Sequence, residues 1–386
     1  MVKEYKPNFL INQYKTDGLN TINHNYLREQ FFDYKIIFDK IEKLILEGDY
    51  TLGKSVDEFE KNICNLTNSK YTIGVGSGTD ALFLSLLATG IQKGDEVITT
   101  PYTFYATIGA IVTAGATPVF VDIRDDYNIN PKLIEAKITD KTKAILPVHW
   151  SGYPCDMGRI CQIADNYNLL IIEDACHGIN AFYKDKPLGT FGITGCFSMH
   201  PLKNLNVWGD GGYIITDSNY IYDKLSLLRN HGLINRNEVD IFGYNSRLDS
   251  IQAIVANHLL KKINYITEKR IHNASYYDNL LSKINEITIP PRPHDVKQVY
   301  HIYVIRAEKR NELVKYLNNN NIDAKIHYPI PMHLQKPSEK YGYKKGDFPI
   351  AEKICNSVIS LPVHEFIKEK DIRYVVEKIK EFYAYN

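Results

Sequence analysis

The sequence predicts an α/β protein with a large, mostly parallel sheet and a smaller C-terminal α+β domain. Short apolar runs alternate with helical segments, and we expect them to form strands at 71–77, 95–101, 117–123, 144–150, 169–175 and 195–200. These runs are apolar throughout, as in strands of parallel sheets that helices cover on both faces. From about residue 256 the pattern changes to long polar helices and one strand at 299–306. We therefore expect a large domain over 1–255, including an N-terminal helical segment, and a small domain over 256–386.

Apolar residues recur at helical spacing between the expected strands. In the large domain this spacing predicts helices at 26–48, 55–68, 78–90 and 103–115. In the small domain it predicts a long polar helix within 257–284 and further helices at 309–321 and 369–385.

Composition and charge exclude several classes of protein. The chain has 386 residues, 44% of them hydrophobic and 24% charged, and its formal net charge is +1. With no long basic run, nothing favours nucleic acid as a partner. No apolar stretch is long enough for a membrane span, and the first 20 residues carry no signal-peptide pattern. The six cysteines are scattered without a CxxC pair, which indicates reduced thiols in the cytoplasm.

Lys203 lies in the stretch "CFSMHPLKNLNVWGDGG", among aromatic residues and glycines where a charged amine is difficult to solvate. Upstream, "GVGSGTDAL" places Gly78 and Thr79 where a strand turns into a helix. A helix N-terminus binds phosphate through its free N–H groups, but a tight turn explains the same glycines equally well. Thr79 stands where a dinucleotide fingerprint needs glycine, and no Gly-Lys-Ser/Thr closes a Walker A loop.

Asp174 ends the apolar run "LLIIEDA", at the edge of the sheet where α/β proteins place ligands. Taken alone, its position favours a cap of the next helix. His177 and His200 have no partner at metal-ligand spacing, and the prolines between His327 and His333 rule out a helical pair. We therefore expect no metal site.

The ordered set of these residues points to one cofactor, pyridoxal 5′-phosphate (PLP). Its phosphate suits the turn at Gly78 and the hydroxyl of Ser198, and its ring suits an aromatic such as Phe104. Its ring nitrogen needs a carboxylate, for which Asp174 is the candidate, and its aldehyde needs a lysine, for which Lys203 is the candidate.

With these motifs in this order, the chain resembles the DegT/DnrJ/EryC1/StrS family of PLP-dependent, mostly sugar, aminotransferases. The resemblance runs from about Asn25 to the C-terminus and also rests on "VITTPYTFYATIGAIVTAGATPVFVDI", "EDACHG", "LRNHGL", "FGYNSRLDSIQA", "VYHIYVI" and "IHYPIPMHLQ". It implies the fold-type I, aspartate aminotransferase-like architecture, with a mostly parallel seven-stranded sheet. It also implies a homodimer with shared active sites.

The resemblance implies a role for each matching residue. Lys203 would bond to the cofactor and then act as the general base, and Asp174 would pair with the pyridine nitrogen. His177 would lie near the phenolic oxygen of the cofactor and Phe104 would stack on its ring. The phosphate would be held by Gly78, Thr79, Ser198 and, from the neighbouring subunit, Asn245.

The chain departs from the family pattern at two places and keeps it at a third. Trp150 and Ser151 in "VHWSGYPCDM" replace the usual dipeptide, and "HNYLREQF" at 24–31 differs from the common opening. Both departures indicate a distinct subgroup. A related dehydratase branch has histidine in place of the lysine, so Lys203 favours transamination over deoxygenation.

The leading hypothesis is therefore an aminotransferase that moves an amino group from an amino acid, with glutamate as the expected donor, to a keto substrate. The expected substrate is a nucleotide-linked keto-deoxysugar for polysaccharide or other cell-surface glycans. A small phosphorylated ketone for capsule modification is an alternative. A second hypothesis is a non-catalytic PLP-fold metabolite sensor or regulator, although such a protein has no need of a proton-transferring lysine. A nucleotide-binding oxidoreductase fails at Thr79 and leaves Lys203 unexplained.

Overall fold

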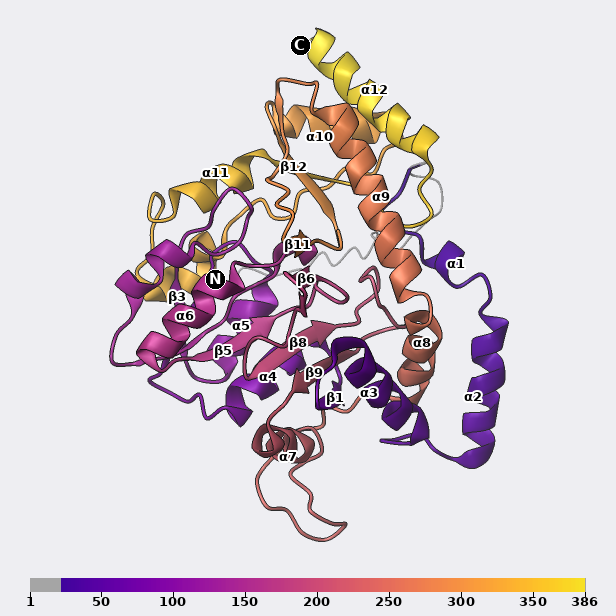
Figure 1. Ribbon diagram of the computed structural model, residues 1–386, viewed down its shortest axis with the longest axis vertical. Coiled ribbons are helices and arrows are strands. Elements are labelled where there is room, and N and C mark those ends of the chain that lie inside the picture. Colours follow the sequence, from indigo (N-terminus) through magenta and orange to yellow (C-terminus); the bar gives the residue numbers. More distant parts are fainter. Residues whose placement is uncertain (1–21, 386) are drawn as a thin grey trace, which may run out of the picture.

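The computed structural model describes residues 22–385 (Figure 1). The prediction that the first 20 residues carry no signal peptide lies outside this range, as do the outermost residues of the two predicted domains. None of the helices in residues 22–385 is both long enough and apolar enough to cross a membrane.

A seven-stranded sheet forms the centre of the large part of the molecule, in the order β1-β9-β8-β5-β4-β2-β3. The strand β9 is antiparallel to both neighbours, and the other pairs are parallel, so the predicted mostly parallel sheet is confirmed. Within this sheet, β9 is the strand that the sequence pattern missed; outside it, the pattern also missed the short strands at 182–183, 186–187, 287–288, 296–297 and 358–361. The bounds are β1 Tyr71–Val75, β2 Glu96–Thr99, β3 Thr117–Phe120, β4 Thr142–Ile145, β5 Leu170–Asp174, β8 Thr194–Ser198 and β9 Gly212–Thr216.

Helices cover both faces of this sheet, which explains why its strands are apolar throughout. Neighbouring residues of one strand enter different cores: Ile214 packs with α4, α5 and α7, whereas Ile215 packs with α3 and α8. The helix α6 covers the second face at β4 and β5. The bounds are α3 Lys54–Thr67, α4 Gly78–Ala88, α5 Tyr105–Thr113, α6 Met157–Tyr167, α7 Asn219–Leu228 and α8 Ser250–Leu260.

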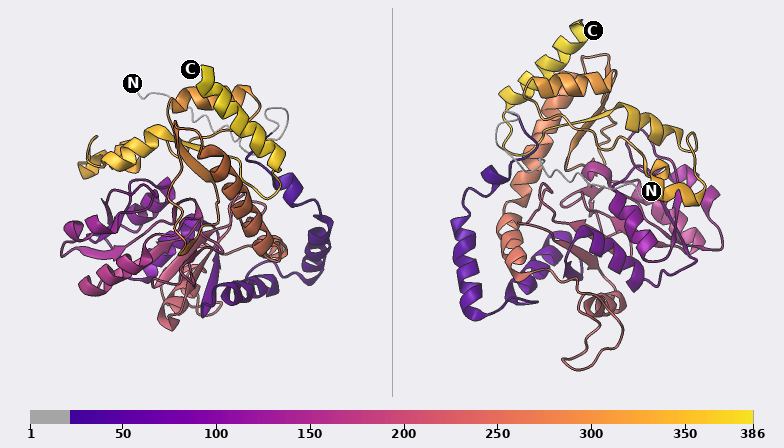
Figure 2. Two further views of the ribbon diagram at one scale, coloured as in Figure 1. Left: turned by 45° about the horizontal axis from the view of Figure 1, so that its top comes forward. Right: turned by 180° about the vertical axis from the view of Figure 1, so that it is seen from behind.

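The C-terminal elements form a second, smaller core around a three-stranded sheet in the order β10-β12-β13. Figure 2 shows α10 and α12 at one end of the molecule and α9 running from that end toward the large sheet. The bounds are α9 Ile263–Leu281, β10 Ile287–Thr288, β12 Tyr303–Ala307, α10 Arg310–Asn319, α11 Pro349–Ser357, β13 Val358–Leu361 and α12 Glu369–Tyr385.

Two features join the large and small parts. The helix α9 packs its first turns, at Ile263 and Ile266, in the large core and its later turns in the small core. A small sheet pairs β11, Val296–Lys297, with β6, Phe182–Tyr183, which also pairs with β7, Lys186–Pro187. The predicted division after residue 255 falls within α8 and stays a prediction.

The N-terminal helix expected at 26–48 is two helices, α1 Leu27–Gln30 and α2 Lys35–Glu47, separated by a turn. The helix α2 packs Ile37 and Leu44 in the large core. Gln30, at the end of α1, instead donates a hydrogen bond to a buried carboxylate of the C-terminal segment. One straight helix could not meet both demands, which accounts for the break.

Candidate active site

A cavity of about 480 Å³ opens at the carboxyl edge of the large sheet, where it meets the C-terminal part. Since β1, β8 and β5 run in the same direction, their carboxyl ends share this edge. The cavity brings together seven of the eight predicted site residues, namely Gly78, Thr79, Phe104, Asp174, His177, Ser198 and Lys203. The eighth, Asn245, is not among the lining residues.

The turn at Gly78 begins α4 and borders the cavity with its first residues. Ser77 is the N-cap, and its hydroxyl accepts a hydrogen bond of 3.0 Å from the Asp80 N–H. Gly78 packs so closely on β8 that a Cβ atom there would come within 2.6 Å of the Ser198 Cβ. The glycine therefore lets the free N–H groups of the helix and the Ser198 hydroxyl share one small space. Such an arrangement suits a phosphate.

The Asp174 carboxylate ends β5 and is 5% exposed. One oxygen accepts a hydrogen bond of 2.8 Å from the Thr107 hydroxyl, and the other accepts one of 3.2 Å from the Cys176 N–H. No helix follows Asp174 before β6, so the alternative of a helix cap is wrong. Thr107 is a partner that the sequence analysis missed, because it lies in a different helix.

Glu173, the neighbour of Asp174, faces away from the cavity and stabilises the fold through buried contacts. It is 0% exposed, accepts hydrogen bonds from the N–H groups of Gly189, Phe191 and Gly192, and lies 3.0 Å from the His149 Nε2 atom. Successive side chains of a strand point to opposite faces, so the two acids have different surroundings. Glu173 holds the loop at 189–192, and Asp174 faces the cavity.

Lys203 lines the cavity from the turn after β8. Burial lowers the pKa of its amine from the usual 10.5 to about 8, against the opposing effects of Cys176 and Asp174. At pH 7 about one amine in ten is then neutral, compared with fewer than one in a thousand for an ordinary lysine. Lys203 is half-buried, and the sequence analysis expected at this position an amine that is difficult to solvate.

His177 is held as a neutral imidazole. Burial, followed by the charge of Lys203, lowers its pKa well below the usual range. The Ser151 N–H donates to its Nδ1 atom at 3.2 Å, so the ring proton is on Nε2 and can be donated. The ring of His301 lies 4.3 Å away between centroids. The backbone N–H of Ser151, which any residue except proline would supply, therefore fixes the His177 tautomer.

Phe104 is the N-cap residue of α5 and lines the cavity beside other aromatic rings. The ring of Tyr105 lies 3.7 Å away between centroids, and that of Tyr328, from the loop "HYPIPMH", lies 5.8 Å away. An aromatic wall therefore forms one side of the cavity, as a planar ring would require.

The N-terminal segment and the C-terminal part contribute the opposite wall of the cavity. Burial lowers the pKa of His327 to about 4, and burial likewise lowers the pKa of His24 and His301 well below the usual range. These rings are neutral at pH 7, so the positive charges on this wall are those of Arg270 and Lys325. Lys325 forms an ion pair of 3.1 Å with Asp323.

Asn245 is exposed, in a loop of residues 230–245 that projects from the body beside α7 (Figure 1). Bridges between Asn230 and Asn245 and between Leu233 and Val239 give the loop its shape. The loop carries Phe242, which is 96% exposed. The prediction that Asn245 contacts a phosphate in a neighbouring subunit stays a prediction.

These residues fit PLP on chemical grounds. The cavity combines helix N–H groups with a hydroxyl for a phosphate, a buried carboxylate for a ring nitrogen, and a readily deprotonated amine for an aldehyde. With the seven-stranded sheet, this set defines a fold-type I PLP-dependent transferase. The model of the DegT/DnrJ/EryC1/StrS aminotransferase family matches residues 34–380, and the chain belongs to this family. It is an aminotransferase, as the resemblance implied.

Individual relatives agree over almost the whole chain. A "Pleiotropic regulatory protein" of Geobacillus stearothermophilus is 40% identical over 93% of this chain and 98% of its own. The dTDP-3-amino-3,6-dideoxy-alpha-D-galactopyranose transaminase of Aneurinibacillus thermoaerophilus is 39% identical over 94% and 98%. The crystal structure of S. venezuelae DesV in complex with a ketimine intermediate has a TM-score of 0.90 at 33% identity, covering 92% of this chain and 97% of DesV.

Proposed function

We propose that this aminotransferase binds PLP in the cavity and transfers an amino group from glutamate to a nucleotide-linked keto-deoxysugar. The observation that carries the proposal is the buried amine of Lys203 in one cavity with the Asp174 carboxylate. The names of the relatives support the substrate class, since one of them is a dTDP-amino-sugar transaminase. Such a sugar would serve polysaccharide or other cell-surface glycans.

Each wall of the cavity would hold a different part of the cofactor. The N–H groups at Gly78 and Thr79 and the hydroxyl of Ser198 would bind its phosphate. Asp174, kept in place by Thr107, would keep the ring nitrogen protonated. When bound, PLP supplies an electron sink that stabilises negative charge on the substrate Cα atom.

The remaining residues would orient the ring and move the proton. The Nε2–H group of His177 would donate to the phenolic oxygen, because its Nδ1 atom already accepts from Ser151. Phe104 would cover one face of the ring. Lys203, once its amine is free, would accept the proton from the substrate Cα and deliver it to the cofactor carbon C4′. A pKa of about 8 suits this transfer, because the amine can both accept and release a proton near neutral pH.

We also infer that the protein is a homodimer with shared active sites. The projecting loop ends at Asn245 and exposes apolar side chains that are unusual on a free surface: Ile234, Val239, Phe242 and Tyr244 are 57%, 51%, 96% and 44% exposed. Seated on a second copy, the loop would bury these side chains and bring Asn245 to the phosphate end of the other cavity. Each of the six cysteines carries a free thiol, which supports a cytoplasmic location.

One observation favours a second candidate, a non-catalytic regulator: a relative at 40% identity is named a pleiotropic regulatory protein. The complete set of Lys203, Asp174 and His177 favours the enzyme instead. A sensor needs to bind its ligand but needs no proton-transferring base.

A half-reaction tests both candidates. The purified protein with PLP is expected to absorb visible light through its bond to Lys203, and glutamate is expected to bleach that band. Addition of a keto-sugar nucleotide should then restore it, and a panel of such sugars and of ketone phosphates would identify the acceptor. Binding of PLP without bleaching by any amino donor would contradict the enzyme and favour the regulator.

A further inference from the structure

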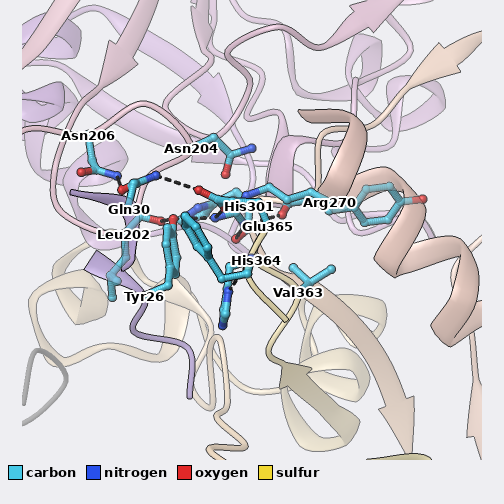
Figure 3. Close-up of polar contacts among 12 residues, drawn as sticks. Tyr26, Gln30, Leu202, Asn204, Asn206, Arg270, His301, Val363, His364 and Glu365 are labelled. Carbon is cyan, nitrogen blue, oxygen red and sulfur yellow. Dashed lines mark hydrogen bonds and ion pairs between the residues drawn. The ribbon is translucent and has the colours of Figure 1, made fainter. Parts of the chain in front are cut away.

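A network of buried polar side chains contacts the backbone at Lys203, and two of its members, Tyr26 and Arg270, also line the cavity. It consists of Tyr26, Gln30, Asn206, Arg270 and Glu365, which are 2%, 2%, 0%, 1% and 6% exposed. Figure 3 shows these side chains converging from the N-terminal segment, the turn after β8, the helix α9 and the segment after β13. A buried polar group is costly unless it is hydrogen-bonded, so the residues at which the hydrogen bonds of this network end indicate its purpose.

The first arm of the network starts at the ion pair between Arg270 and Glu365, whose Nη2 and Oε2 atoms are 3.5 Å apart. The same Nη2 group donates to the hydroxyl of Tyr26. That hydroxyl in turn lies 3.3 Å from the carbonyl oxygen of Leu202 and 3.4 Å from that of Lys203. Its single proton is therefore shared between the two carbonyls that flank the Lys203 Cα atom.

The second arm starts at the same carboxylate and ends at the same carbonyl. The Gln30 amide donates to the Glu365 Oε1 atom at 2.9 Å, and its own oxygen accepts from the Asn206 amide at 2.7 Å. Asn206 then donates to the Lys203 carbonyl oxygen at 2.9 Å. Two arms that share the Glu365 carboxylate thus meet on the backbone of one residue, which mere filling of an interface would not require.

The backbone at this point needs such support. Leu202 has a φ of +74°, in the left-handed region that side-chain-bearing residues avoid. Such a conformation persists only where its surroundings over-determine it, and it is typical of functional sites. Since Leu202 directly precedes Lys203, its φ and ψ angles set the direction in which the lysine leaves the chain.

The network also ties the turn to the C-terminal part of the molecule. Arg270 donates from Nη1 to the carbonyl oxygens of Tyr300 and His301, at 3.1 and 3.3 Å. His301 lines the cavity from the C-terminal part of the chain. Through Arg270, hydrogen bonds therefore connect the turn at Lys203 with both walls of the cavity.

We propose that Tyr26, Gln30 and Asn206, anchored on the Arg270–Glu365 pair, are positioning residues that hold Leu202 in its left-handed conformation and so direct the Lys203 amine into the cavity. The proposal gives a role to "HNYLREQF", the stretch that departs from the common family opening, because it supplies both Tyr26 and Gln30. It rests on the proposed function only in taking that amine to be the cofactor-binding group.

The test compares four full-length variants with the wild type: Tyr26→Phe, Leu202→Gly, the double variant of these two, and Tyr303→Phe as the control. Tyr303→Phe also removes a buried tyrosine hydroxyl, one that donates to Asp278 at 2.6 Å, but away from the cavity. The first readout is the pKa of Lys203 in the cofactor-free chain, from the pH dependence of its acetylation followed by peptide mass spectrometry. The second is the dissociation constant of PLP.

We expect a midpoint near 8 for Lys203 in the wild type. Tyr26→Phe should raise it by about one pH unit and weaken PLP binding about tenfold, because the amine leaves its desolvated position. Glycine adopts a positive φ freely. The shift caused by Tyr26→Phe should therefore fall to less than about half in the Leu202→Gly background. Tyr303→Phe should lower the melting temperature but change neither readout.

Three results would overturn the proposal: no change in either readout for Tyr26→Phe, equal changes for Tyr303→Phe, or an undiminished shift in the Leu202→Gly background. If Tyr26→Phe does not fold, Asn206→Ala removes the second arm and should move both readouts in the same direction. If the wild type binds no PLP, the proposed function fails, and the acetylation profile still decides the role of the network.

Discussion

The two walls of the cavity differ in how they are built. The sheet wall takes Gly78, Asp174, Ser198 and Lys203 from strand ends and the turns that follow them, so short-range rules of α/β folds place them. The opposite wall is assembled from single residues of distant segments, joined by buried hydrogen bonds. On the proposals above, the first wall would carry the chemistry of amino-group transfer, whereas the second would hold Lys203 in place.

The largest expected effect is on the sheet wall. Lys203→Ala should slow the half-reaction with glutamate about 10²–10⁴-fold, because it removes the proton-transferring base. Stopped-flow absorbance at a fixed PLP concentration measures the rate. Lys132→Ala, a change at an exposed lysine, serves as the control and should leave the rate unchanged. A rate within tenfold of wild type in Lys203→Ala would assign the base to another residue.

Asp174 and Glu173, the two neighbouring acids of β5, are expected to respond differently to substitution although both belong to the sheet wall. Asp174→Asn should lower the rate about 10²–10³-fold while changing stability little, since it removes a preorganised charge at the ring nitrogen. Glu173→Gln should instead destabilise the fold by about 2–3 kcal/mol, because three backbone N–H groups lose a charged acceptor. Paired rate and urea-denaturation measurements separate the two effects. Equal loss of rate in both variants would contradict the division of roles.

The pH dependence of the stability of the cofactor-free chain should reveal the lowered pKa of the Lys203 amine. The pKa of Lys203 is lower in the folded chain than the usual 10.5, so the unfolded chain binds more protons between about pH 8 and 10.5, and stability rises with pH there. Lys203→Met should thus be more stable than the wild type by about 2 kcal/mol at pH 7, an amount that allows for water in the cavity. The advantage should vanish by about pH 10.5. A constant difference from pH 7 to 10.5 would show that the amine is solvated.

The smallest expected signal is a partial recovery of activity through the projecting loop. Lys203→Ala and Asn245→Asp should each be inactive alone, the second because its charge repels the phosphate. Mixed under exchange, they should recover about a quarter of wild-type activity, since half of the dimers are mixed and each has one intact site. Without recovery in subunits shown to exchange, Asn245 would act in its own subunit or not at all.

Sequence reasoning reached the sheet wall because its residues belong to local patterns. The strand–turn–helix at Gly78, the strand-end Asp174 and the glycine-rich stretch around Lys203 each carry a signal within a few positions. The sequence left two interpretations open for Asp174, a helix cap or a site residue. The choice depended on whether a helix follows Asp174 directly, and none does.

The opposite wall could not be found in this way. Tyr26, Arg270 and Glu365 are far apart in the chain and carry no shared spacing, so only the fold brings them together. The break between α1 and α2 has the same origin, because α1 reaches to the C-terminal segment while α2 packs on the large core. The strand β9 was missed because it follows a glycine-rich loop directly and reverses direction in an otherwise parallel sheet.

One measurement tests the central claim, that Lys203 is the cofactor-binding residue of this aminotransferase, most directly. The PLP-loaded protein is reduced with borohydride, digested, and its peptides are mapped by mass spectrometry. We predict that the pyridoxyl phosphate mass is carried by the peptide containing Lys203 and that prior treatment with glutamate abolishes the label. A label on any other lysine, or an unlabelled protein, would contradict the account.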